Sequence, residues 1–213
     1  MNEINIPESI TDIEEEFTVA WFELKNKNNE QESSLDQDSQ NFNVLKQAVG
    51  QIIEGQAAEK QQIRTKTWPD GTKYEGDMKD GKPHGYGRKV YHNKIHVGQF
   101  LNGKRHGRGI TRMQNGAVYR GEFKDNVPDG EGVETLKSGK KYVGSFKNNK
   151  KHGYGEETYP SGREYKGYWK NDKYHGKGTF SRINRFKYAG EFENGLPHGK
   201  GVSITRSGTK HVG

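Results

Sequence analysis

Hydrophobic and polar positions alternate with the period of a β-strand over most of the chain. In the stretch that begins at Tyr119, the residues Tyr119, Gly121 and Phe123 alternate with charged side chains. Side chains two positions apart in a strand point to the same face, so these three residues share one face. A turn and a Gly-x-Gly motif follow, and the same order returns throughout residues 67–213. The pattern predicts a series of antiparallel β-hairpins.

This pattern repeats at an almost constant spacing. The motif Tyr-x-Gly-x-aromatic, with His in place of Tyr at two positions, begins at Tyr74, His96, Tyr119, Tyr142, Tyr165, Tyr188 and His211. The first interval is 22 residues and each later one is 23 residues. A fixed period of this length is typical of repeat architectures, in which each unit is one supersecondary element that stacks on its neighbours.

Turn residues separate the predicted strands. A pair rich in Asn, Asp and Gly follows each aromatic residue and supplies the positive φ that tight hairpins need. These pairs are Asp80-Gly81, Asn102-Gly103, Asn148-Asn149, Asn171-Asp172 and Asn194-Gly195. We expect the second strand of each unit to start at the Gly-x-Gly motif and to end at a second turn such as Ser138-Gly139 or Ser161-Gly162.

Aromatic rings are predicted to form the core. Glycine inside a strand weakens a sheet unless something packs over it, and rings on the same face can cover the glycines of the paired strand. A sheet one layer thick can then bury apolar area without a second layer. We expect this core, and with it part of a partner-binding surface, at Tyr119, Phe123, Tyr142, Phe146, Tyr165, Trp169, Tyr188 and Phe192.

The first 66 residues follow a helical period instead. Ser9 and Asp12 have the spacing of a capping box, and apolar residues then recur every three or four positions. An amphipathic helix is therefore expected over residues 1–24. Three of its apolar residues are predicted to dock on a partner: Phe17, Trp21 and Leu24.

Two further segments complete the predicted N-terminal region. Residues 25–41 are almost wholly polar, which predicts a flexible acidic linker. Residues 42–66 are expected to form a helix that caps the first edge of the sheet, because the ends of a repeat array need protection from edge-to-edge pairing. The fold class is thus mainly β, an elongated single-layer antiparallel meander with a short α-helical N-terminal region.

Charge divides the chain at the same place as the pattern. Residues 1–66 hold 13 acids and 6 bases, whereas residues 67–213 hold 15 acids and 29 bases. The basic excess has three interpretations: a solvated face that keeps an open sheet soluble, attraction to anionic lipid, or attraction to an acidic protein surface, for which the chain's own residues 1–38 are a candidate. Nucleic acid is disfavoured as a partner, because the rings are needed to cover glycines.

Candidate chemistry is sparse. The chain has no cysteine, which excludes disulfides and thiolate chemistry, and only 28% of its residues are hydrophobic. Five histidines share one repeat position, but neighbouring copies would lie about 9–10 Å apart, too far for their rings to converge on zinc. We expect these side chains to orient the turn by hydrogen bonding: His84, His106, His152, His175 and His198. No catalytic constellation stands apart from the repeat, so we expect no enzyme, no cofactor and no metal site.

The unit Tyr-x-Gly-x-Phe/Trp-x-x-Gly-x-x-His-Gly-x-Gly resembles the MORN repeat (membrane occupation and recognition nexus). The resemblance covers about residues 67–213, and Trp68 to Gly71 resembles the back half of a degenerate preceding unit. It implies a structural scaffold for protein–protein interaction in a cytoskeletal assembly, including the ciliary axoneme and its radial-spoke heads. The alternative is a cytoplasmic, peripheral membrane adaptor that binds acidic phospholipids. A homodimer through the sheet edge is a further expectation.

Overall fold

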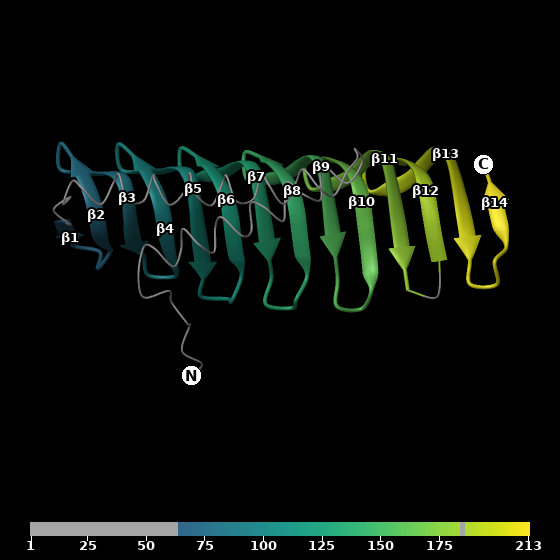
Figure 1. The fold of residues 1–213 in the computed structure, drawn as a ribbon, viewed down its shortest axis with the longest axis horizontal. Coiled ribbons are helices and arrows are strands. Elements are labelled where there is room, and N and C mark those ends of the chain that lie inside the picture. The colour runs from purple at the N-terminus through teal and green to yellow at the C-terminus, as the bar shows by residue number, and fades with distance from the viewer. Residues whose placement is uncertain (1–63, 184–185) are drawn as a thin grey trace, which may run out of the picture.

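The computed structural model describes residues 64–183 and 186–213, which form one open antiparallel sheet of fourteen strands (Figure 1). Each strand pairs with the strand next to it in sequence, so the sheet is a meander from β1 to β14. The prediction of a single-layer antiparallel meander is confirmed for these residues. The helix predicted over 1–24, the linker over 25–41 and most of the segment 42–66 lie outside the described residues. Within the described part, no helix has the length and apolar character needed to cross a membrane.

The strands are three to ten residues long and follow the repeat period. They are β1 (Arg64–Thr67), β2 (Lys73–Lys79), β3 (Lys82–Val90), β4 (Lys94–Leu101), β5 (Lys104–Met113), β6 (Val118–Lys124), β7 (Val127–Thr135), β8 (Lys141–Lys147), β9 (Lys150–Thr158), β10 (Arg163–Lys170), β11 (Lys173–Arg182), β12 (Phe186–Glu193), β13 (Leu196–Thr205) and β14 (Lys210–Val212).

The predicted hairpin turns are confirmed. Both residues of the turn Asn148-Asn149 have positive φ, 50° and 65°, which is the conformation that joins strands of right-handed twist most directly. The turn between β6 and β7, Asp125-Asn126, has the same conformation without a glycine. Each turn also contacts the preceding repeat, because the Asn149 amide donates to the Pro128 carbonyl oxygen at 2.8 Å. The hairpin tips are therefore tied together along the sheet.

The second strand of each unit begins earlier than predicted. In repeat one, β3 starts at Lys82, three residues before Gly85 opens the Gly-x-Gly motif. The expectation that this strand starts at the motif is wrong, because a two-residue turn brings its flanking residues into register at once, and Lys79 pairs with Lys82. The register then shifts between Gly76 and Met78, where a β-bulge takes up the extra residue.

The boundary at the N-terminal end of the sheet also needs correction. Residues Arg64–Thr67 form β1, which pairs with Lys73–Gly76 of β2, so residues 64–66 are strand and not part of the helix predicted over 42–66. The turn that follows contains Gly71 with φ of 80°, and the Trp68 amide donates to the Thr72 carbonyl oxygen at 2.9 Å. The incomplete unit that the sequence indicated around Trp68 thus supplies the first edge strand of the sheet.

Candidate binding surface

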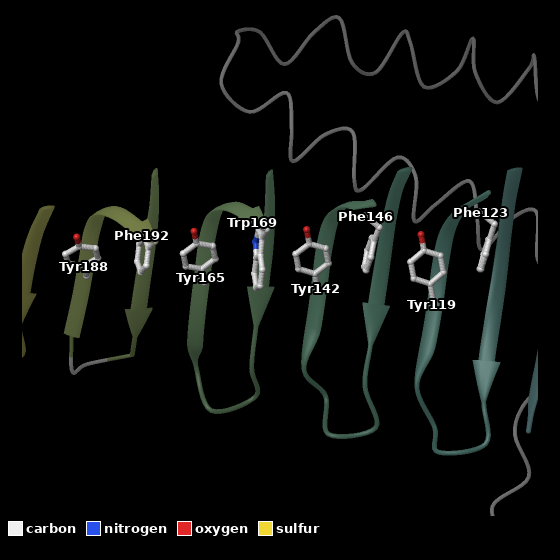
Figure 2. Packing of buried hydrophobic residues seen from close by; sticks show 8 residues of the cluster. All are labelled: Tyr119, Phe123, Tyr142, Phe146, Tyr165, Trp169, Tyr188 and Phe192. Carbon is white, nitrogen blue, oxygen red and sulfur yellow. The ribbon is translucent and has the colours of Figure 1, made fainter. Parts of the chain in front are cut away.

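One face of the sheet carries an unbroken row of aromatic rings. Figure 2 shows the tyrosines alternating with Phe or Trp on the same side, with the hydroxyls of the four labelled tyrosines pointing in the same direction along the strands. Neighbouring rings meet edge to face with centroids 4.9–5.3 Å apart, a geometry worth about 0.5–1.5 kcal/mol per pair beyond area burial. The row runs Tyr74, Phe100, His96, Phe123, Tyr119, Phe146, Tyr142, Trp169, Tyr165, Phe192 and Tyr188. We call this side the aromatic face.

All eight rings predicted as core are at least nine-tenths buried, so that part of the prediction is confirmed. Their direct contact with a partner stays a prediction, as does that of Phe17, Trp21 and Leu24, which lie outside the described residues. A partner on this face would meet the polar side chains that flank the rings before it met the rings themselves.

Glycines lie directly beneath the tyrosine rings. Gly144 pairs with Gly155 across β8 and β9, and a Cβ atom at Gly155 would lie 2.3 Å from the Tyr142 hydroxyl oxygen. The hydroxyl reaches over these glycines and donates to the Ser145 carbonyl oxygen at 3.0 Å. Burial raises the pKa of Tyr142 well above its ordinary value, so the donor remains protonated. The predicted covering of glycines by rings is confirmed.

Repeat two departs from this pattern at His96. The ring is fully buried and takes the place of a tyrosine, with Nδ1 2.9 Å from the Thr111 hydroxyl oxygen. Its Nε2 is buried without a hydrogen-bond partner. Burial, followed by the positive charges of Arg105 and Lys94, lowers the pKa of His96 well below 6.5, so the imidazole is neutral.

Cations gather at this end of the aromatic face. The Lys89 Nζ lies 4.6 Å from the Trp68 ring centroid, and the Lys94 Nζ lies 5.0 Å from that of Tyr91. Arg105 is half-buried beside them. Burial lowers the pKa of all three basic groups. We call Lys89, Lys94, Arg105, Trp68 and Tyr91 the cationic end.

Two repeats further on, the same positions form a closed network. Lys151 pairs in register with Phe146 as Arg105 does with Phe100, and its Nζ lies 2.5 Å from Glu157 Oε2. Lys140 contacts the same oxygen at 2.8 Å. Burial opposes ionisation of Glu157, but hydrogen bonds from the two lysines hold its pKa below the ordinary value.

Two tyrosines complete this network. The hydroxyls of Tyr159 and Tyr174 donate to Glu157 Oε1 at 2.8 and 3.2 Å. Tyr174 also stacks on Tyr165 with centroids 3.7 Å apart, and burial raises its pKa to about 12. We call Lys140, Lys151, Glu157, Tyr159 and Tyr174 the ion-paired centre.

Sequence reasoning missed the residues that distinguish these two regions. They occupy the position before the repeat histidine, which is filled in turn by Pro83, Arg105, Pro128, Lys151, Tyr174 and Pro197. The signal that could have found them is this variation at a fixed position of an otherwise regular unit. The partner at position 157 needed the strand register as well, since Glu157 faces Tyr142 across β8 and β9.

Two of the five repeat histidines do not act as expected. Nδ1 of both His84 and His152 is buried without a hydrogen-bond partner, so the predicted role of orienting the turn is wrong for these two rings. The positive φ of the glycine that follows, 71° at Gly153, and the hairpin turn itself set the chain direction there. Within the described ranges, no three His, Asp or Glu side chains gather as metal ligands would.

A groove of about 760 Å³ lies at the connectors of the last repeats, between β9 and β14. It is lined by Arg163, Arg182 and Arg206, together with apolar side chains that include Ile183 and Phe186. Ile183 is 68% exposed and Phe186 is 37% exposed, so the groove has two exposed apolar side chains beside its basic groups. The groove therefore combines positive charge with exposed apolar surface.

Comparison with known families identifies the repeat. A family model described as MORN repeat matches residues 74–94, 96–118, 119–141, 142–162, 165–184 and 188–210. These segments begin at the six ring positions from Tyr74 to Tyr188 that start the repeats of the sheet. No curated protein matches the chain.

Proposed function

The chain belongs to the MORN-repeat family, whose repeats are interaction modules for proteins or membranes, and on that premise we propose that it is a non-enzymatic scaffold of a cytoskeletal assembly. Its aromatic face would bind a segment of another protein. The proposed assembly is of the type found in the radial-spoke head of the ciliary axoneme.

The cationic end is the observation that supports this proposal most. The rings of the aromatic face pack edge to face on one another, and eight of them form one buried cluster. Lys89, Lys94 and Arg105 nevertheless remain half-buried on that face and form no ion pair within the described residues. Desolvated cations without a carboxylate are unfavourable in the free protein and become favourable when a partner supplies the opposite charge.

Cross-linking mass spectrometry in a native extract tests the scaffold proposal. We expect cytoskeletal proteins to cross-link to lysines of the aromatic face, and the variant Lys89→Glu/Lys94→Glu to lose those neighbours. The matched control is Lys147→Glu/Lys150→Glu, which changes the net charge equally at an exposed hairpin tip. Identical neighbours for both variants would contradict the proposal.

The groove between β9 and β14 favours a second candidate function, a peripheral membrane adaptor. Arginines can contact lipid phosphates while Ile183 and Phe186 enter the interfacial layer, and each well-placed base adds about 1 kcal/mol on an anionic surface.

Vesicle sedimentation separates this function from the first. A membrane adaptor should bind vesicles containing phosphatidylinositol bisphosphate at low salt, lose binding as salt rises, and fail in the variant Arg182→Glu/Ile183→Asp. Equal sedimentation of the variant and the unaltered chain would remove the groove from consideration.

A further inference from the structure

Among the described residues, the cationic end has no carboxylate that corresponds to Glu157 of the ion-paired centre. Arg105 Nη1 donates to the Thr111 hydroxyl at 3.2 Å and another guanidinium nitrogen to the Asn126 carbonyl oxygen, while its Nε is buried without a partner. The guanidinium carbon lies 5.0 Å from the Phe123 ring centroid. Among the described residues, Arg105 therefore donates to two uncharged oxygen atoms and pairs with no carboxylate.

Burial likewise disfavours the charges of Lys89 and Lys94, the other two cations of the cationic end. Burial lowers the pKa of both Lys94 and Arg105, and the charge of Arg105 lowers that of Lys94 further. Among the described residues, neither one forms an ion pair with a carboxylate. Burial lowers the pKa of Lys89 more than the charge of Asp70 raises it, and the Asp70 carboxylate accepts a hydrogen bond from the Thr72 amide at 2.9 Å. Two exposed or half-buried rings, Trp68 and Tyr91, flank the three cations. The surface is therefore fitted to a ligand that is both acidic and apolar.

One segment of the chain has this chemistry. Residues 10–24 contain five acids and no base, and the same stretch carries Phe17, Trp21 and Leu24 at helical spacing. Residues 64–213, by contrast, carry the whole basic excess of the molecule. We propose that the acidic segment 10–24 docks in cis on the cationic end of the aromatic face, with its carboxylates on Lys89, Lys94 and Arg105 and its rings against Trp68 and Tyr91.

The connection between the two is long enough. The cationic end spans β1 to β5, which is roughly 20 Å of sheet at about 4.8 Å per strand. The linker predicted over residues 25–41 would span about 23 Å, and the helix predicted from residue 42 would span about 33 Å up to residue 63. A tether of this length gives an effective concentration on the order of millimolar, so even a weak contact is populated within one molecule.

Docking of this kind would regulate the scaffold. It rests on the proposed function in one respect, because a partner that uses the aromatic face must first displace segment 10–24. A partner with a more acidic or more apolar segment would open the molecule, whereas other proteins would be excluded. Binding of the partner at this site would then release residues 10–24.

Distance measurement by electron spin resonance tests the docking in the full chain. Because the chain has no cysteine, Val19→Cys with Asn93→Cys carries two unique spin labels. We expect a population with label distances below roughly 30 Å, whereas labels at Val19→Cys and Ser207→Cys, about ten strands apart, should lie beyond roughly 40 Å. Lys89→Glu/Lys94→Glu should lower the ratio of docked to free molecules at least about tenfold, and Lys147→Glu/Lys150→Glu should leave it within about twofold.

Each other outcome overturns the proposal. Absence of a short distance in the unaltered chain removes docking altogether, and an equal short population in both charge variants removes its electrostatic basis. A short distance seen only when singly labelled chains are mixed assigns the segment to a second copy. A short distance that appears only after vesicles with phosphatidylinositol bisphosphate are added assigns the surface to lipid. The scaffold proposal would survive these results if cross-linked neighbours still depended on Lys89 and Lys94.

Discussion

The second and fourth repeats have the same backbone and opposite electrostatics. Arg105 and Lys151 lie at one repeat position, each beside the aromatic residue of its own unit and against a ring of the next. Across the strands, the fourth repeat offers Glu157 to its cation, while the second offers the hydroxyl of Thr111. The fourth repeat therefore forms an ion pair because it has Glu157 where the second repeat has Thr111, and Arg105 of the second repeat has no ion pair among the described residues.

The comparison separates the residues that specify the sheet from the residues that determine the charge of its surface. The glycine pairs and the strand register are the same in both repeats although His96 replaces a tyrosine in the second, so these features specify the sheet. The residues that differ lie just above the rings and change the charge of the surface without changing the register. A repeat protein can thus vary its binding surface one unit at a time while the scaffold stays constant.

The largest expected effect tests the shared scaffold. A Cβ at Gly109 would lie 2.5 Å from His96 Cε1, and one at Gly155 would lie 2.3 Å from the Tyr142 hydroxyl oxygen. We expect Gly109→Val and Gly155→Val each to lower the free energy of unfolding by about 4 kcal/mol, because ring and backbone must both move. Urea denaturation measures this, with Gly213→Val as the control, since nothing lies within 4 Å of that position. A loss below about 1 kcal/mol at either buried glycine would show that the two repeats do not share the packing described here.

The next effect separates the two regions. Glu157→Ala removes the nearer carboxylate of the buried Lys151, which keeps only Glu134 at 3.8 Å, and it should cost about 3 kcal/mol of unfolding free energy. The equivalent change in repeat two, Thr111→Val, removes the hydrogen bond with neutral His96 and one of the two hydrogen bonds that Arg105 donates, and it should cost about 1.5 kcal/mol because the Asn126 carbonyl still accepts from Arg105. The double variant Lys151→Met/Glu157→Leu should recover most of the loss, because the uncompensated charge is gone. Equal losses of unfolding free energy in Glu157→Ala and Thr111→Val would contradict the distinction between the ion-paired centre and the cationic end.

The two regions should also respond to different ranges of pH. His96 has a lowered pKa, so the unfolded chain binds its proton first, and stability should fall as the pH drops below about 6.5. Glu157 has a lowered pKa too, and its contribution is kept above about 4.5 and lost as the pH falls through its folded-state value.

Replacing His96 with Tyr tests whether His96 causes the loss of stability expected below about pH 6.5. The hydroxyl could donate to the Gln99 carbonyl as Tyr142 does to that of Ser145, which should add about 1 kcal/mol at neutral pH. Unfolding of His96→Tyr should also be independent of pH between about 5 and 6.5, where the unaltered chain loses up to about 1.4 kcal/mol per pH unit. The same slope in both chains would show that His96 is not the group that titrates.

Much of the scaffold could be predicted from the sequence because the repeat presents its pattern six times. Alternation placed Tyr119 and Phe123 on one face, and turn chemistry located Asn102-Gly103 between strands. The start of β3 at Lys82 could not be predicted in the same way, because the Gly-x-Gly motif suggested a boundary that is set by the turn. The bulge that follows Gly76 is a property of pairing between strands, and alternation within one strand does not reveal it.

The candidate surface was less predictable for a physical reason. A contact such as Lys151 to Glu157 joins residues six apart that meet only after two strands have paired through a bulge. The unpaired state of Arg105 depends likewise on the absence of an acid at position 111, which has meaning only once the register is known. The aromatic residues predicted as core form the floor beneath these charges, and their contact with a partner stays a prediction.

Conversion of the second repeat into a copy of the fourth tests the central claim most directly. The variant His96→Tyr/Thr111→Glu gives Arg105 the carboxylate that Lys151 already has, and the label distance between Val19→Cys and Asn93→Cys can be measured in it. We expect the short-distance population to fall at least about tenfold while the free energy of unfolding is not reduced. A short-distance population that persists in this variant would contradict the claim that an unpaired cation is what distinguishes the two repeats as binding surfaces.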